Sequence, residues 1–130
     1  MRTSELVGYS YVVLRCVPRV ERGEFINVGV VVYCQARDYL RAGCHLDTDR
    51  LRALDANLDV AATRSALAAV DDVCSGATAA GEVAGAPLGT RFGFLTAPRS
   101  TVIQPGPVHG GLTTDPDTAL AALLDTLVRS

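Results

Sequence analysis

The pattern of hydrophobic residues predicts three β-strands near the N-terminus. Residues 9–17 and 25–34 are rich in Val, Ile and Tyr, and residues 39–45 form a third, shorter segment. β-Branched and aromatic residues of this kind are typical of strands. The links between the three segments are short, so we expect an antiparallel meander.

The second segment, FINVGVVVYC, predicts one fully apolar face. Its even positions from Ile26 to Cys34 are all apolar, whereas its odd positions from Phe25 to Tyr33 are mixed. Successive strand residues point to opposite faces, so the even positions are expected to face the core. Gly29 in mid-strand predicts a bulge or a close backbone approach, and Asn27 beside it needs a hydrogen-bond partner.

Capping residues and periodic leucines predict three helices. Asp47 or Thr48 can cap a short helix, and Asp59 can cap a longer one that ends at Gly76. A last amphipathic helix follows Asp115, where a proline stands at the first helical position.

The remaining segments predict little regular structure. Residues 77–90 are rich in Gly and Ala without periodicity and are interpreted as a flexible loop. Two short strands are expected at residues 91–96 and 100–104, and the prolines and glycines of residues 105–111 predict an irregular connection. Together the segments predict one α+β domain over residues 1–130, with helices packed on one face of an antiparallel sheet.

The composition excludes several classes of function. The chain has 130 residues, a net charge of −2 and twelve basic residues, all of them Arg. Chemistry that needs a lysine ammonium, such as a Schiff base or a Walker phosphate loop, is therefore excluded. The balanced charge argues against a nucleic-acid binder, and no segment is long and apolar enough to cross a membrane. The four cysteines without CxxC spacing, and an N-terminus without a secretory signal, indicate reduced, buried thiols in a cytoplasmic protein.

The first candidate site is the charged link between the first two strands. Arg19 and Glu24 lie in this link, and the simplest interpretation is a solvated turn with ion pairs worth ~0–1 kcal/mol each. Arg15 differs because it lies within a strand. If its face meets that of Asn27, a cluster of Arg15, Asn27 and Glu24 could form a binding site.

The second candidate site is the proline-stiffened segment 96–112. Stiff segments hold a shape without a core beneath them, which suits a recognition surface. The alternative is an ordinary connection made of turn residues. Its candidate binding residues, all able to donate hydrogen bonds, are Arg99, Ser100, Thr101, Gln104 and His109.

No cofactor or metal site is expected. Cys44 and His45 are adjacent in a predicted strand and point to opposite faces, so they cannot share one ion. Asp47 and Asp49 have the spacing that opens an EF-hand loop, but the required Gly and Glu are missing. The three residue types of a hydrolytic triad are present without the elbow motif of such enzymes.

Two long segments resemble a known family. YVVLRCVPRVERGEFINVGVVVYC (residues 11–34) and FGFLTAPRSTVIQPGPVHGGLTTDP (residues 92–116) are similar to the bacterial DUF3037 family, a domain of unknown function, and the likeness covers about residues 9–128. The resemblance supplies no catalytic residue. It implies a gene beside that of a HipA-like kinase, and hence a small companion that binds or restrains this kinase as in a toxin–antitoxin pair.

Two functional hypotheses follow. The first is a non-enzymatic protein-interaction module that binds a protein partner through the charged hairpin and the segment 96–112. The second is a small enzyme or a nucleotide- or phosphate-binding domain, which requires Arg15, Arg99 and His109 to converge on one concave site.

Overall fold

The predicted meander forms three of the four strands of an antiparallel sheet. A computed structural model describes residues 5–129 of the chain. The strands are β1 (Val7–Cys16), β2 (Ile26–Cys34), β3 (Tyr39–Cys44) and β4 (Ile103–Thr113). Their order in the sheet is β3-β2-β1-β4, so β1 lies between β2 and β4, and β4 forms an edge. Short 3-10 turns, η1 (Val20–Arg22) and η2 (Gln35–Arg37), connect the first three strands.

The two predicted helices after the meander are confirmed. α1 (Thr48–Leu54) begins at Asp47, whose carboxylate accepts a hydrogen bond from the amide of Arg50 at 3.2 Å. α2 (Val60–Ser75) begins at Asp59, which caps the amide of Ala62 at 3.0 Å. α2 ends at Gly76, whose φ of 75° is a left-handed conformation that glycine adopts without strain.

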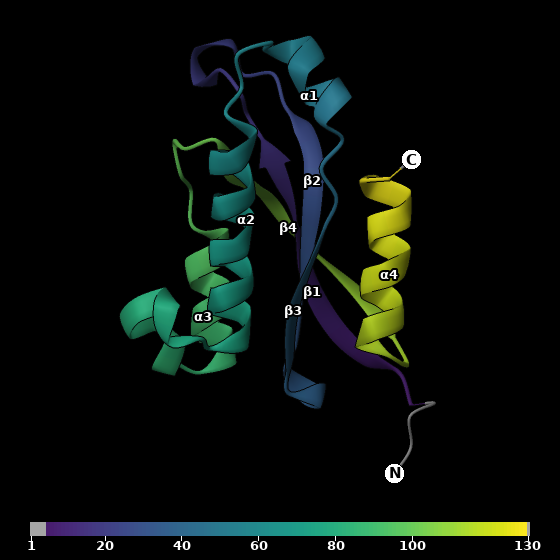
Figure 1. Cartoon of the computed structure of the whole chain (residues 1–130). Coiled ribbons are helices and arrows are strands. Elements are labelled where there is room, and N and C mark those ends of the chain that lie inside the picture. The colour runs from purple at the N-terminus through teal and green to yellow at the C-terminus, as the bar shows by residue number, and fades with distance from the viewer. Residues whose placement is uncertain (1–4, 130) are drawn as a thin grey trace.

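Helices cover both faces of the sheet, which corrects the expectation of one covered face (Figure 1). α2 packs on one face against Val12, Leu14 and Val31, together with α3 (Leu88–Thr96). α4 (Pro116–Leu127) packs on the other face, over Val30 and Val32. The α+β class is confirmed, and the sheet is a central layer between two helical layers. The strands of such a layer need apolar residues on both faces, as β2 has.

A bulge in β2 changes which residues face which helices. Leu14 pairs with Gly29, but Arg15 pairs with Asn27, so Val28 is an extra residue opposite β1. The bulge predicted from Gly29 is therefore confirmed. The prediction that all even positions of β2 share one face is wrong. The extra residue turns Val28 towards α2 and Val30 towards α4.

The segment after α2 differs from the expected loop and strands. Residues 78–85 form 3-10 turns (η3, Thr78–Gly85), and the strand predicted at 91–96 lies within α3. Phe92 and Leu95, one helical turn apart, are the buried residues of α3. Whether residues 77–90 are flexible stays a prediction.

The segment predicted to be irregular is part of β4. PGPVHGG lies within this 11-residue strand. Proline is tolerated at a sheet edge because its missing N–H can face away from the neighbouring strand. The pairing register with β1 shifts between Val12 and Leu14, next to the two prolines.

The cysteines are free thiols. Cys16, Cys34 and Cys74 are buried, whereas Cys44 is partly exposed. Burial raises the pKa of Cys16 to about 11 and that of Cys74 to about 12. Within residues 5–129 no helix is long and apolar enough to cross a membrane.

Candidate functional site

The centre of the sheet brings the two candidate segments side by side. Arg15 of β1 is paired with Asn27 of β2 on one side and with Gln104 of β4 on the other. Paired residues of antiparallel strands project from the same face. Leu14 and Cys16 belong to the core cluster under α2. Arg15 therefore faces the α4 side of the sheet.

The guanidinium of Arg15 is held between an aromatic ring and the backbone. Its Cζ lies 4.2 Å from the centroid of the Phe25 ring. On the β4 side, a Cβ placed on Gly106 would lie 3.2 Å from three guanidinium atoms, so a larger residue there would push the guanidinium aside by a few tenths of an ångström. The Nε–H of Arg15 is shielded from solvent and has no hydrogen-bond partner among the described residues. We call the group of Arg15, Phe25, Asn27, Gln104 and Gly106 the Arg15 surface.

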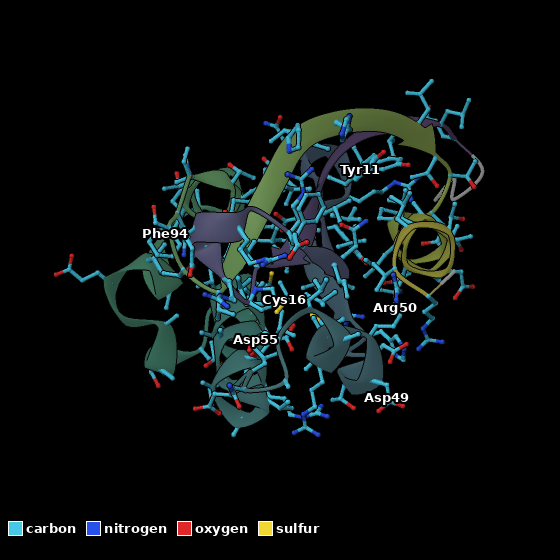
Figure 2. The ribbon with its side chains drawn as sticks, turned by 90° about the horizontal axis from the view of Figure 1, so that it is seen from above. Tyr11, Cys16, Asp49, Arg50, Asp55 and Phe94 are labelled. Atoms are coloured by element: carbon cyan, nitrogen blue, oxygen red, sulfur yellow. The ribbon has the colours of Figure 1, made fainter. Side chains whose placement is uncertain are left out.

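Asn27 connects this surface to α4. Its Nδ2 donates a hydrogen bond to the carbonyl oxygen of Leu127 at 3.1 Å, which satisfies the polar group that β2 carries on this face. A hollow of about 160 Å³ lies here between Phe25, Asn27, Leu127 and Arg50 of α1. Figure 2 shows Arg50 between the rest of α1 and α4. The surface thus has a rigid wall formed by the last turn of α4.

The charges in the hairpin link pair with one another. Arg19 contacts Glu21 at 2.9 Å, and Arg22 contacts Glu24 at 2.8 Å, with all four side chains exposed. Hydrogen bonds from Arg22 hold the pKa of Glu24 below its ordinary value. The expected cluster of Arg15, Asn27 and Glu24 does not form, because the carboxylate of Glu24 accepts hydrogen bonds from Arg22 instead. Arg19 and Glu24 are turn residues at the rim of the site.

Arg99 lies on the other face of the sheet. Its Cζ is 4.6 Å from the ring centroid of Phe94, and its Nη2 donates a hydrogen bond to the Phe94 carbonyl. It lines a cavity together with Leu14 and Thr101. Thr101 itself donates to the carbonyl of Ile103 at 2.8 Å and accepts at its carbonyl from Gln104 at 2.9 Å. These bonds fix the turn before β4.

His109 is remote from both arginines. It is opposite Tyr11 in the register of β1 and β4, with ring centroids 5.3 Å apart. Tyr11 is four residues from Arg15, which places His109 about 13 Å away along the strand. Arg15, Arg99 and His109 therefore do not converge on one concave site. Ser100 is exposed, in the irregular link between α3 and β4.

The sequence reasoning missed two residues of the Arg15 surface. Phe25 was assigned only to the mixed face of a strand, and Gly106 only to an irregular connection. A signal for Gly106 is its position between Pro105 and Pro107, since a glycine in a stiff segment often permits close approach of a neighbouring group. Phe25 carries no comparable signal, because its contact with Arg15 depends on the pairing of β1 and β2.

The described residues offer no candidate metal centre. In residues 5–129 no group of three or more His, Cys, Asp or Glu side chains could hold an ion. The chemistry within reach of the Arg15 surface is therefore that of a guanidinium, an amide and an aromatic ring. These groups bind carboxylates, carbonyl oxygens and apolar side chains.

The fold and the site define a small α+β domain that carries the Arg15 surface as its candidate site. A family model described as "Protein of unknown function (DUF3037)" matches residues 11–128, which is nearly the whole chain. The chain belongs to the DUF3037 family. No curated protein and no solved structure was found to match it.

Proposed function

We propose that this domain is a non-enzymatic protein-interaction module that binds its partner through the Arg15 surface. The observation that carries the proposal is the guanidinium of Arg15, held against Phe25 with a buried Nε–H that has no acceptor. A buried donor without a partner costs ~1–3 kcal/mol. The half-buried guanidinium offers its terminal N–H groups to a carboxylate or carbonyl oxygen of a partner.

The composition of the surface favours a protein partner. Arginine and aromatic residues are enriched among the residues that contribute most to protein–protein binding. Phe25 is 44% exposed and Val20 of η1 is 48% exposed, so apolar area is available beside the guanidinium. The ion pairs of the hairpin provide a polar rim around it. This arrangement suits an acidic side chain flanked by an apolar one.

The separation of the three candidate cations argues against the phosphate-binding hypothesis. A nucleotide phosphate is normally held by several converging donors. Here Arg99 lines a cavity on the other face of the sheet, and the ring of His109 lies tilted against that of Tyr11. Of these three candidate cations, only Arg15 contacts Phe25.

The experiment measures binding to the partner that the family resemblance suggests, a HipA-like kinase encoded beside the gene. Purified kinase and the intact domain are mixed, and the dissociation constant is measured by calorimetry. The variant Arg15→Met removes the donors but keeps an aliphatic stem, and we expect it to weaken binding by about tenfold or more. The matched control Arg19→Met, in the same hairpin, is expected to bind within about twofold of the unmodified domain.

Two outcomes contradict the proposal. One is a domain that binds neither this kinase nor any other protein in pull-downs from the native host and elutes as a monomer. The other is a complex whose dissociation constant Arg15→Met and Phe25→Ala leave unchanged. Thermal unfolding of each variant verifies that the fold is retained.

A further inference from the structure

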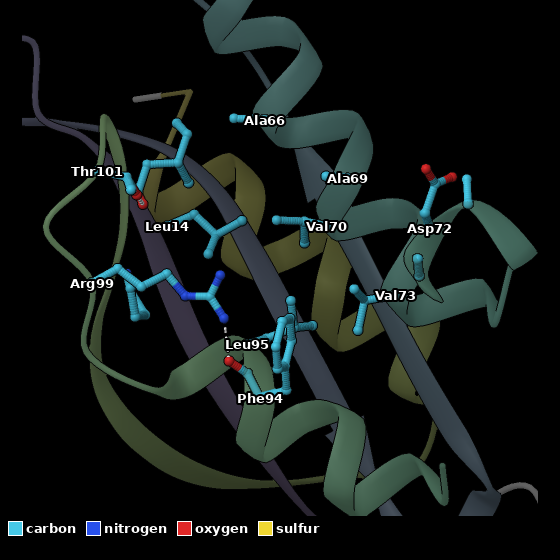
Figure 3. Close-up of a pocket in the computed structure, with 14 residues that line it drawn as sticks. Leu14, Ala66, Ala69, Val70, Asp72, Val73, Phe94, Leu95, Arg99 and Thr101 are labelled. Carbon is cyan, nitrogen blue, oxygen red and sulfur yellow. Dashed lines mark hydrogen bonds between the residues drawn. The ribbon is translucent and has the colours of Figure 1, made fainter. Parts of the chain in front are cut away.

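A cavity of about 380 Å³ lies on the face of the sheet opposite the Arg15 surface (Figure 3). Leu14 and Ile103 of the sheet form one wall, and Val70 of α2 and Leu95 of α3 form others. Its volume is within the range of pockets that bind small molecules. The cavity does not include any residue of the Arg15 surface, so the inference below is independent of the proposed function.

Small side chains create the cavity. α2 presents Ala66 and Ala69 to it, and η3 presents Ala79 and Ala80. A methyl group does not reach across the space between a helix and a sheet, whereas a leucine would fill much of it. Most of the other lining residues are apolar, which favours an apolar ligand body.

Arg99 is the one cationic residue that lines the cavity. Its guanidinium is fixed by the Phe94 ring at 4.6 Å and by a hydrogen bond to the Phe94 carbonyl, drawn as a dashed line in Figure 3. An arginine has five N–H donors, and a single hydrogen bond leaves most of them free. The ion pairs found in residues 5–129 involve other arginines, so Arg99 has no carboxylate within 4.0 Å there.

We propose that this cavity binds a small amphiphilic carboxylate, with its apolar body among the alanines and its carboxylate on Arg99. A guanidinium fork matches the two oxygens of a carboxylate, and this one is held in place before the ligand arrives. Asp72 is the only acidic residue in the lining. Figure 3 shows it across the cavity from Arg99. A ligand with a second anionic end is disfavoured there by like charge.

The test is a titration of the intact, isotopically labelled domain with sodium octanoate, followed by amide chemical shifts. Saturable shifts are expected at Ala66, Ala69 and Ala80. Octanol, which lacks the charge, and acetate, which lacks the tail, are expected to bind at least about tenfold more weakly. Equal affinity for octanol, or no shift at these amides at millimolar octanoate, overturns the proposal.

Three variants separate the cavity from a general effect of charge. Arg99→Gln is expected to weaken octanoate binding by about tenfold or more, because it removes a charge-assisted bond. Arg52→Gln, on the exposed side of α1, is the matched control and is expected to leave the affinity unchanged. Ala69→Leu fills the cavity and is expected to abolish the shifts while the spectrum stays dispersed. If Arg99→Gln and Arg52→Gln bind alike, the assigned site is wrong.

Discussion

The Cζ of Arg15 lies 4.2 Å from the ring centroid of Phe25, on the α4 side of the sheet. Arg15 belongs to β1, whereas Phe25 immediately precedes β2. The contact therefore joins the two strands at the loop end of the β1–β2 hairpin. It also holds the guanidinium in one orientation. A partner that binds the Arg15 surface would meet the guanidinium in that orientation.

A double-mutant cycle measures this contact. Arg15→Met and Phe25→Leu are combined, and the free energy of unfolding of each protein is determined with urea. We expect a coupling energy of about 0.5–1 kcal/mol, which is typical of a cation over an aromatic ring near the surface. Val20→Ala in place of Phe25→Leu is the control, and its coupling to Arg15 is expected to be near zero. Additive effects in the first cycle would show that the two groups do not interact.

Gly29 is required for the close approach of β2 to its neighbours. A Cβ at this position would lie 3.0 Å from the carbonyl oxygen of Gly43 and 3.1 Å from the sulfur of Cys44. Since the carbonyl belongs to the backbone of β3, it cannot move away easily. Gly29→Ala is expected to lower the free energy of unfolding by about 1–3 kcal/mol.

Gly93→Ala is the matched control for Gly29→Ala. Gly93 lies within α3, and a Cβ there meets no atom within 4 Å. Alanine favours the helix more than glycine does, so a gain of up to about 1 kcal/mol is expected. Thermal unfolding of both variants is the measurement. A Gly29→Ala variant that is as stable as the unmodified protein, or more stable, would refute the crowding at Gly29.

Hydrogen bonds from Arg91 of α3 connect the end of η3 to the end of α2. Its Nε donates to the carbonyl of Ala86 at 2.9 Å, and its Nη1 donates to those of Val73 at 3.2 Å and Cys74 at 3.0 Å. Arg91→Met removes these charge-assisted bonds, and a loss of about 2–3 kcal/mol in the free energy of unfolding is expected. Hydrogen exchange is expected to accelerate in residues 78–88. Arg64→Met, on the exposed face of α2, serves as the control and should change neither quantity.

The buried thiols predict low reactivity in the folded protein. Burial raises the pKa of Cys16 and Cys44 to about 11 and that of Cys74 to about 12. The thiolate is the reactive form, so iodoacetamide at a pH near 8.5 should modify these residues far more slowly in the folded chain than in concentrated urea. Mass spectrometry of tryptic peptides gives the rates. Comparable rates in both states would contradict the burial.

The same shifts determine the sign of a pH effect on stability. Each of these thiols has a higher pKa in the folded state than in the unfolded chain. Their contribution to the free energy of unfolding is therefore fully present below a pH of about 8.5, the pKa of a thiol in the unfolded chain. It is lost as the pH rises towards the folded values. The urea midpoint is therefore expected to fall between neutral and strongly alkaline pH, and a rise would contradict the shifts.

Local chemistry was sufficient to predict much of the fold. Asp47 and Asp59 cap helices, Gly76 ends one, and the Val-rich runs pair as a meander, because each of these signals acts within a few residues of sequence. The prediction failed at residues 91–96 and 105–111. RFGFLT has few helix formers, and its helix depends on the burial of Phe92 and Leu95 under α2 and the sheet. Residues 105–111 form a strand because β1 presents a free edge to them.

The candidate site was predicted in part, through Arg15, Asn27 and Gln104, which the pairing of three strands brings together. The sequence could not reveal that Arg99 faces away from them. Arg99 lies in the link between α3 and β4, and its side chain is placed by contacts with Phe94 of α3, which follow from helix packing.

The amino-acid sequence by itself determined the class of fold, the caps of three helices and the absence of lysine chemistry, since these depend on composition and on neighbours along the chain. Only the tertiary structure decided that α4 covers a second face, that Phe25 and Gly106 enclose Arg15, and that Arg99 lines a cavity on the opposite face of the sheet. Those relationships join residues far apart in sequence, and their geometry follows from strand pairing and helix packing rather than from local preference.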